Sequence, residues 1–282
     1  MFNPLQLGTI IVKLRIKKME TLSLVYYSPT GTTAKIVKEI GIHTGLKLIS
    51  EHNIAENNID LQTERDNNCL TIIGLPVYGG RLPLTTIEAL KKLKSNQSPI
   101  VIVVVYGNRD YDDALLELKE ITHNCGFKII AGAAFIGEHS YSSDEKPVAK
   151  NRPDRQDLEK CKDFAKKIMS KLKNKKGLNK LSELAVSGNF PYKERNKLPA
   201  TLYPETNNAI CDLCGICVDV CPTDAIIIEE TVITNGDLCT WCCACVKYCP
   251  HEARIFSNAT INAIQNRLVL NCSERKEPEF FV

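Results

Sequence analysis

Eight cysteines in the C-terminal part of the chain follow one spacing twice, and each run of four is followed directly by proline. Both runs read C-x2-C-x2-C-x3-C-P, a pattern typical of [4Fe–4S] ligation in which the fourth cysteine ligates the cluster of the other run. Two intervening residues allow successive thiolates to converge on one cube. The spacing therefore predicts two [4Fe–4S] clusters, one held by Cys211, Cys214, Cys217 and Cys249 and the other by Cys239, Cys242, Cys245 and Cys221.

The two cysteine runs belong to an internal repeat. Cys211 and Cys239 are 28 positions apart, as are Cys221 and Cys249, and the residues after the fourth cysteines also match. Structural zinc sites use cysteine pairs with a longer gap between them, and disulfides require an oxidising compartment, so both fit this pattern less well. We interpret Cys243, which neighbours a predicted ligand, as a spare thiol. The remaining cysteines are expected to be small buried hydrophobes: Cys69, Cys125, Cys161 and Cys272.

A second candidate site lies near the N-terminus, where residues 22–27 read as a buried strand and residues 32–43 as a helix. The intervening loop is rich in hydroxyls and lacks lysine and arginine, which distinguishes it from a Walker loop. Backbone N–H groups and the helix dipole at such a junction attract an anion, and neutral hydroxyls suit a single terminal phosphate. One hydroxyl would suffice for an ordinary helix cap. The predicted phosphate-binding residues are Ser28, Thr30, Gly31, Thr32 and Thr33.

Two further loops, residues 74–83 and 106–111, follow the third and fourth predicted strands. Tyr78 and Tyr111 offer flat aromatic faces, and the glycines let the backbone approach a planar ring closely. Either tyrosine alone fits a half-buried packing residue equally well. The three loops together favour a flavin, and FMN is the expected form. Its predicted ring-binding residues are Pro76, Val77, Tyr78, Gly79, Gly80, Tyr106, Gly107, Asn108 and Tyr111.

The elements that must position these loops alternate along the chain. Five predicted strands and four predicted helices imply a parallel sheet with helices on both faces. In a doubly wound α/β sheet, ligands bind beyond the carboxyl ends of the strands, at the point where the strand order reverses. The three loops would lie at or beside this switch point. The strands are expected at residues 22–27, 46–50, 70–74, 100–106 and 127–135, and the helices at residues 32–43, 84–94, 112–124 and 154–174.

Ser28 begins a stretch, Ser-x-Thr-Gly-Thr-Thr, that resembles the FMN-phosphate loop of flavodoxins. Gly74 begins a second stretch, Gly-x-Pro-Val-Tyr-Gly-Gly-Arg-x-Pro. Together with the cysteine runs, residues 20–256 resemble the bacterial and archaeal flavodoxin–ferredoxin fusion proteins of the EFR ferrodoxin family. The resemblance implies an α/β flavodoxin-like domain with a doubly wound parallel sheet, followed by a small α+β bacterial 2[4Fe-4S] ferredoxin-like domain. Neither ring loop contains the tryptophan that many flavodoxins stack on the flavin.

The expected domain organisation follows from these motifs and from the composition between them. Proline and glycine interrupt the chain repeatedly before the first cysteine run, which is typical of a linker. We expect one short helix in the C-terminal tail, around residues 261–270. The boundaries are an N-terminal extension at residues 1–19, a flavodoxin-like FMN domain at 20–176, a linker at 177–205, a ferredoxin domain at 206–256 and the tail at 257–282.

Charge is distributed unevenly, although the net charge is only +3. Residues 150–197 carry 15 Lys and Arg against 6 Asp and Glu, whereas residues 198–256 carry 2 against 8. Apolar residues recur at helical spacing within the basic stretch, so we interpret its lysines as a solvated helix face and not as a nucleic-acid site. The acidic segment predicts a redox partner protein with a basic docking face. It also predicts that the cluster domain docks on the basic helix of residues 154–176 and that salt slows electron flow between the domains.

The sequence contains no apolar run near the ~18 residues of a membrane span. In residues 1–19 the basic residues follow the apolar ones, which is the reverse of a signal peptide. We therefore expect a cytoplasmic protein, a location that suits reduced thiolates and oxygen-sensitive clusters.

These cofactors together predict an electron-transfer iron–sulfur flavoprotein that passes electrons between FMN, two clusters and a redox partner. One alternative is an FMN-dependent oxidoreductase that reduces its own small acceptor, such as a quinone or a metal ion. Another is a redox or iron sensor. The sequence shows no nucleophile–base pattern and no paired-carboxylate site, so no catalytic residue is assigned. An electron carrier and an oxidoreductase are both consistent with the motifs.

Iron counting tests the ligand assignment. We expect eight irons and eight acid-labile sulfides per chain after anaerobic purification, because each quartet would hold one [4Fe–4S] cube. Cys217→Ser should lower the iron count by damaging one cluster. Cys243→Ser is the matched control and should keep eight irons, since its thiol lies outside the repeated spacing. An unchanged count of eight in the Cys217→Ser protein would contradict the assignment.

Overall fold

The computed structural model describes residues 19–55, 68–174, 182–195, 199–256 and 258–282. Residues 1–18 of the expected N-terminal extension lie outside the described residues.

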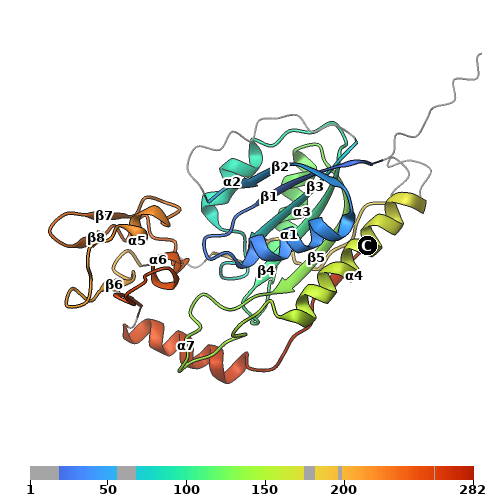
Figure 1. The fold of residues 1–282 in the computed structure, drawn as a ribbon. Helices are drawn as coiled ribbons and strands as arrows, with labels where there is room; N and C mark the ends of the chain where they lie inside the picture. Colours follow the sequence, from blue (N-terminus) through green and yellow to red (C-terminus); the bar gives the residue numbers. More distant parts are fainter. Residues whose placement is uncertain (1–18, 56–67, 175–181, 196–198, 257) are drawn as a thin grey trace, which may run out of the picture.

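The chain forms a large α/β unit and a small cysteine-rich unit (Figure 1). The α/β unit contains β1 (Thr21–Tyr26), α1 (Thr32–Thr44), β2 (Lys47–Asn53), β3 (Cys69–Pro76), α2 (Leu84–Lys91), β4 (Pro99–Tyr106), α3 (Ala114–Asn124), β5 (Lys128–Ile136), α4 (Arg155–Asn174) and β10 (Glu279–Phe281). The cysteine-rich unit contains β6 (Glu205–Thr206), α5 (Ile216–Asp219), β7 (Ile226–Ile228), β8 (Val232–Thr234), α6 (Ala244–Lys247) and β9 (Arg254–Ile255), and α7 (Ala259–Asn271) leads from it back to β10.

The sheet of the α/β unit is parallel except at one edge. Its strand order is β10-β5-β4-β3-β1-β2, and β10 runs antiparallel to β5. The pairs among β1 to β5 are all parallel. β4 consists largely of β-branched residues and is buried along its whole length, as expected when helices cover both faces. Without the edge strand, the order 2-1-3-4-5 is that of flavodoxin-like folds. The fold class expected from the sequence is therefore confirmed.

Helices cover both faces of this sheet (Figure 1). α1 and α4 lie together on one face, where Val37 and Phe164 join a core cluster. Leu90 of α2 and Leu115 of α3 are buried in the cluster on the other face. α1 approaches the sheet closely at Gly74 of β3, because a Cβ there would lie 2.2 Å from Val37 Cγ2. This close approach fixes the N-terminus of α1 beside the carboxyl ends of β1 and β3.

Part of the segment expected as a linker packs on the α/β unit. Leu184 is buried in the core cluster that also contains residues of α3. The backbone N–H groups of Asn189 and Lys193 donate to the carboxylate of Asp113, the N-cap residue of α3, at 2.7 and 2.6 Å. The described residues 182–195 are therefore held against the α/β unit on the side of α3.

The C-terminal tail returns to the sheet. Phe280 of β10 pairs with Ala133 of β5, and its ring stacks on Phe164 of α4 with the centroids 4.9 Å apart. The sequence indicated the helix in this tail but not the strand, because three residues are too few to show a period. The cysteine-rich unit is thus inserted between α4 and β10, and both of its ends connect to the α/β unit.

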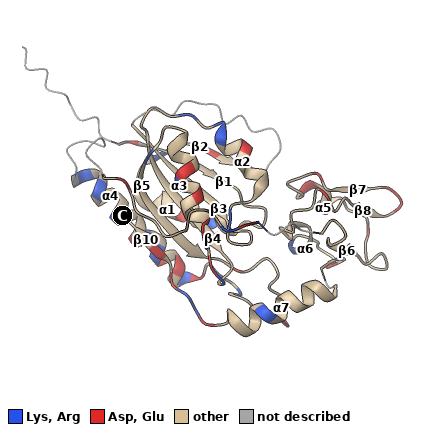
Figure 2. Cartoon of the chain, turned by 180° about the vertical axis from the view of Figure 1, so that it is seen from behind, with Lys and Arg blue, Asp and Glu red and all other residues tan. Residues whose placement is uncertain are grey.

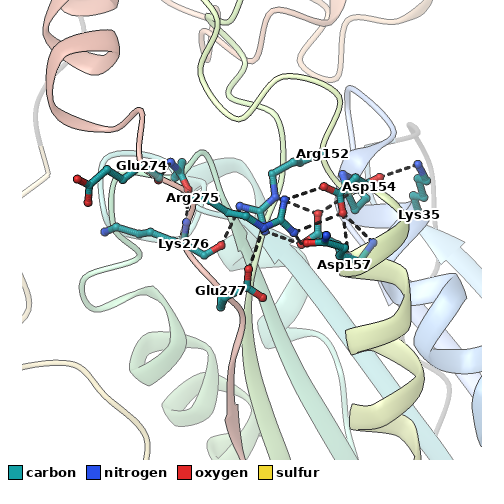
Figure 3. A network of polar contacts seen from close by, with 11 residues as sticks. Lys35, Arg152, Asp154, Asp157, Glu274, Arg275, Lys276 and Glu277 are labelled. Atoms are coloured by element: carbon teal, nitrogen blue, oxygen red, sulfur yellow. Dashed lines mark hydrogen bonds and ion pairs between the residues drawn. The ribbon is translucent and has the colours of Figure 1, made fainter.

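A polar network fastens the tail where it passes the N-terminus of α4 (Figure 3). Arg152 and Asp157 form a buried pair with Nη2 and Oδ1 2.5 Å apart. Arg275 of the tail donates to Asp154 Oδ2 at 2.7 Å and lies 3.4 Å from Asp157 Oδ1. The Arg275 guanidinium holds the pKa of Asp154 well below its usual range. Arg152 Nη1 also donates to the Lys276 carbonyl oxygen at 2.9 Å, so the same buried arginine joins α4 to the tail.

The cysteine-rich unit does not dock on α4, so the docking predicted from the charge contrast is wrong. It lies beyond the carboxyl ends of the strands, away from α4 (Figures 1 and 2). α4 buries Phe164 and Ile168 in the core, whereas Lys166 and Lys167 are exposed. Burial of apolar side chains determines what α4 contacts, and its lysines form a solvated face.

The buried pair at the start of α4 should contribute strongly to stability. Asp157→Asn leaves Arg152 buried without a counter-charge, so it should lower the free energy of unfolding by about 3–5 kcal/mol. Asp163→Asn, on the exposed side of the same helix, should cost less than about 1 kcal/mol because its partner Lys166 is solvated. Urea unfolding followed by far-UV circular dichroism measures both changes. Equal losses in the two variants would contradict this assessment.

Candidate functional site

The two cysteine quartets surround two cavities in the small unit. Among the cysteines, the first cavity is lined by Cys211, Cys214, Cys217 and Cys249, and the second by Cys221, Cys239, Cys242, Cys243 and Cys245. Each cavity thus draws one cysteine from the other run, which is the crossed arrangement that the sequence pattern predicted. In the described ranges, no three His, Cys, Asp or Glu side chains are close enough together to hold a single metal ion. Each quartet surrounds a volume and not a point, as a cube of iron and sulfur requires.

The same left-handed turns shape both cysteine loops. Leu213 and Trp241, 28 positions apart, have φ angles of 60° and 58°, and Gly215 and Cys243 have φ angles of 84° and 62°. Gly215 and Cys243 are the N-cap residues of α5 and α6. Cys243 therefore stands where the first copy has a glycine. It is buried, and burial raises its pKa well above the usual value of a thiol.

Contacts to cysteine sulfur also recur in both copies. The Ala225 N–H donates to Cys221 Sγ at 3.3 Å, and the Ala253 N–H donates to Cys249 Sγ at 3.2 Å. Burial raises the pKa of Cys242 to about 12. A thiolate at this depth requires a positive partner, which iron provides when bound. Thiols around a cavity, with N–H groups on their sulfurs, fit an iron–sulfur cluster.

The predicted phosphate loop lies at the N-terminus of α1. Gly31 is the N-cap residue in a left-handed conformation (φ 80°), and as a glycine it offers no side chain to cap the helix. Ser28 Oγ accepts a hydrogen bond at 3.0 Å from a backbone N–H in the first turn of α1. Thr33 is buried, whereas Thr30 and Thr32 are partly exposed. The structure brings all five predicted phosphate-binding residues to one turn.

The second predicted loop forms a tight turn after β3. Tyr78 and Arg81 exchange two backbone hydrogen bonds across it, at 2.8 and 3.2 Å. Gly79 and Gly80 have φ angles of 62° and 91°. A Cβ at Gly80 would lie 2.0 Å from Asp112 Oδ2, so the turn requires glycine there. This packing holds the Pro76–Gly80 segment in place beside the third loop.

The third predicted loop makes contacts that the sequence did not indicate. Asn108 is buried, and its side-chain nitrogen donates to two backbone carbonyl oxygens of the C-terminal tail, both at 2.7 Å. Tyr111 Oη donates to Glu279 Oε2 of β10 at 2.8 Å. Both side chains therefore anchor the tail. The other two predicted ring-binding residues of this loop are Tyr106 and Gly107. Among the described hydrogen bonds, neither makes such a contact to the tail.

Contacts between the two units come from the second cysteine run. Lys247 of α6 donates to Glu138 Oε1 at 3.2 Å. Trp241 contacts Phe256 edge-on with the ring centroids 5.6 Å apart, and Phe256 contacts Tyr141 in the same way at 5.7 Å. An aromatic layer therefore links the second cysteine loop to the α/β unit.

Tyrosines of the α/β unit lie within electrostatic range of the second quartet. Burial raises the pKa of Tyr27 and of Tyr78, and a negative charge on Cys242 acts in the same direction on both. Burial likewise raises the pKa of Tyr141, followed by the effect of Cys243. Tyr27 and Tyr78 belong to the loops after β1 and β3. The second quartet is therefore adjacent to the switch point of the sheet.

Two buried hydroxyls lie close together at the same junction. Tyr27 Oη and Thr240 Oγ1, one from each unit, are near enough to interact, although no hydrogen bond of good geometry joins them. The Tyr248 hydroxyl, from the small unit, lies 3.3 Å from the position that a Cβ on Gly31 would take. The surroundings of the phosphate loop therefore fit an additional polar group.

Sequence analysis did not identify Tyr27, Tyr141 or Tyr248 as site residues. Each acts at a junction between segments that are distant in the sequence, and no local spacing marks such a position. Tyr248 is the exception in one respect, because it directly precedes the fourth cysteine of the second run. Its place next to a predicted ligand could have drawn attention to it.

Comparisons with known proteins found one family model and several solved structures that are similar to parts of this chain. A family model described as a 4Fe-4S binding domain matches residues 204–227, which include the first cysteine run. The Flv1 flavodiiron core from Synechocystis sp. PCC6803 is one similar structure. The matched region covers 55% of this chain and 36% of that core, with 17% identity and a TM-score of 0.39. The chain thus spans about a third of that core. A flavodoxin from the domain Archaea matches 55% of this chain and 99% of its own, with 13% identity and a TM-score of 0.36.

A flavodoxin of Streptococcus pneumonia TIGR4 is similar over 54% of this chain and 99% of its own, with 16% identity and a TM-score of 0.38. No curated protein matches the chain. Within the described ranges, no helix has both the length and the apolar character needed to cross a membrane. The chain therefore combines a flavodoxin-like fold, defined by its strand order, with a region similar to 4Fe-4S binding domains.

Proposed function

We propose that this chain is an electron-transfer iron–sulfur flavoprotein with a [4Fe–4S] cluster on each cysteine quartet and FMN at the switch point between β1 and β3. The observation that carries the proposal is that Tyr27 and Tyr78, from the loops that follow β1 and β3, lie within electrostatic range of Cys242 in the second cysteine loop. A bound flavin would supply two-electron exchange and the clusters one-electron exchange. The resemblance to flavodoxin–ferredoxin fusion proteins of the EFR family supports the same function in the cytoplasm.

The phosphate loop would bind the FMN phosphate through neutral donors. Ser28, Thr30, Thr32 and Thr33 bring hydroxyls to a helix N-terminus whose N-cap residue is a glycine, where the helix dipole favours an anion. Tyr248 would add a hydroxyl from the cluster unit, because it already lies over this loop. Binding of the phosphate would therefore also draw the two units together.

The flavin ring would lie against the Pro76–Gly80 turn and the backbone at Gly107. Gly79, which has a left-handed conformation and open space where a Cβ would lie, keeps a side chain away from the ring face. Tyr78 and Tyr141 would exclude water between the ring and the second quartet, since both are close to its cysteines. Trp241 Nε1 donates to the Leu202 carbonyl oxygen at 2.6 Å, which fixes the indole beside the same cysteines.

The first quartet would exchange electrons with a partner protein. Cys214 is exposed, and the neighbouring Ile210 and Leu213 are 49% and 42% exposed. Acidic residues are visible on this unit in loops beside β7 and β8 (Figure 2), and Glu229 and Glu230 are exposed in the turn between these strands. An apolar contact beside acidic residues fits a redox protein with a basic rim.

Selective binding of FMN tests the phosphate loop. Apoprotein should bind FMN more tightly than riboflavin, because removing the phosphate leaves converging donors unpaired. Thr30→Ala should weaken FMN binding by about 1–3 kcal/mol and leave riboflavin binding nearly unchanged. Ser182→Ala, at an exposed hydroxyl outside the loop, is the control and should change neither. Quenching of flavin fluorescence measures these affinities. Equal affinity for FMN and riboflavin would refute the site.

A further inference from the structure

The two halves of the cysteine-rich unit differ in charge at a buried position. Ile226 and Arg254 are 28 positions apart, the same interval that relates the two cysteine runs, and each is 3% exposed. Ile226 lines the second cavity and belongs to an apolar cluster with both Cys217 and Cys245. Arg254 Nη2 lies 3.8 Å from Sγ of Cys245, the counterpart of Cys217 in the second copy. A hydrocarbon in one half is therefore replaced by a guanidinium in the other.

Arg254 is held between the two quartets without a carboxylate partner. Its Nη1 donates to Thr206 Oγ1 at 2.6 Å, and its Nη2 donates to Thr234 Oγ1 at 2.9 Å. Nε is buried and has no hydrogen-bond partner within the described part of the chain. The side chain lines both cavities. No ion pair to a described acidic residue offsets its charge, and a buried charge without such compensation is costly.

We propose that Arg254 makes the cluster on the second quartet the more easily reduced of the two. This proposal rests on the proposed function, because it requires a cluster on each quartet. Reduction adds one negative charge to a cluster, and a positive charge and hydrogen bonds at its sulfurs stabilise that charge. The stabilisation is greatest where the guanidinium touches a ligand sulfur, at Cys245, and falls with distance. Arg254 also lines the first cavity, but among the described hydrogen bonds the ligand sulfur that it reaches is Cys245 of the second quartet.

The resulting difference gives electron flow a direction. One electron given by a partner protein would reduce the cluster on the exposed first quartet. Its transfer would return that cluster to its starting oxidation state and reduce the second cluster by one electron, and no proton needs to move. The second quartet is the one beside Tyr27 and Tyr78. Arg254 therefore favours the state in which the electron is on the second cluster, next to the switch point of the α/β unit.

A purely structural role for Arg254 would predict a different result. Its bonds to Thr206 and Thr234 join β6 and β8, so a structural role would affect folding or cluster content. It would not lower the potential of one cluster selectively in a protein that retains both clusters. The separation between the two cluster potentials is therefore the informative quantity.

The experiment is an anaerobic potentiometric titration of the intact chain, followed by EPR of the reduced clusters. Iron and sulfide analysis is done first, since a wild-type chain without eight of each would contradict the proposed function itself. Arg254→Ile restores the residue of the first half. It should lower the reduction potential of the second cluster, the higher of the two, by about 59 mV, which corresponds to a tenfold change in the one-electron reduction equilibrium. The lower potential, that of the first cluster, should change much less.

Two further variants control this measurement. Arg254→Lys keeps the charge and should leave the higher potential closer to the wild-type value than the isoleucine variant does. Arg267→Ile removes an exposed arginine from α7 and should shift neither potential. Equal shifts of both potentials in Arg254→Ile, or none, would overturn the proposal. If Arg254→Ile has fewer than eight irons, Arg254→Gln takes its place, and an unchanged separation in that variant would overturn the proposal equally.

Discussion

The pairing of β10 with β5 is the constraint on which the arrangement of the two units depends. Because the final strand completes a sheet that β1 began, the chain must leave the α/β unit after α4 and return to it. Carboxylates hold both connections: Asp113 binds the outgoing segment, and Asp157 with Arg152 holds the returning tail. The cysteine-rich unit is consequently tethered at two ends, which confines it to the carboxyl end of the sheet.

This confinement gives a nearly repeated unit two different environments. The second cysteine loop meets the tyrosines after β1 and β3, whereas the first remains exposed at Cys214. The replacement of Ile226 by Arg254 in the second copy adds a chemical difference to this geometric one. An outward quartet suited to a partner and an inward quartet suited to the flavin site follow from the same insertion.

The sequence predicted those features that local patterns encode. The cysteine spacing assigned the two quartets, and short apolar runs that alternate with helical segments located the five parallel strands. It did not predict β10, whose three residues show no period, or the contacts of Asn108 and Tyr111 with the tail, which join segments more than 160 positions apart. The charge contrast was misleading because the lysines of α4 are a solvated face. Arg254 and Ile226 stand at equivalent positions of a visible repeat, but only the structure shows that both are buried.

The most direct test is the concentration dependence of electron transfer from the clusters to the flavin in the intact chain. Anaerobic stopped-flow would follow flavin reduction after rapid reduction of the clusters, over a wide range of protein concentration and at low and high salt. Because both units belong to one doubly tethered chain, we predict a first-order rate that is independent of protein concentration. The rate should also be nearly independent of salt, because among the described residues a single ion pair, Lys247 with Glu138, joins the units. A rate that rises in proportion to protein concentration, or that falls steeply with salt, would contradict transfer across this junction.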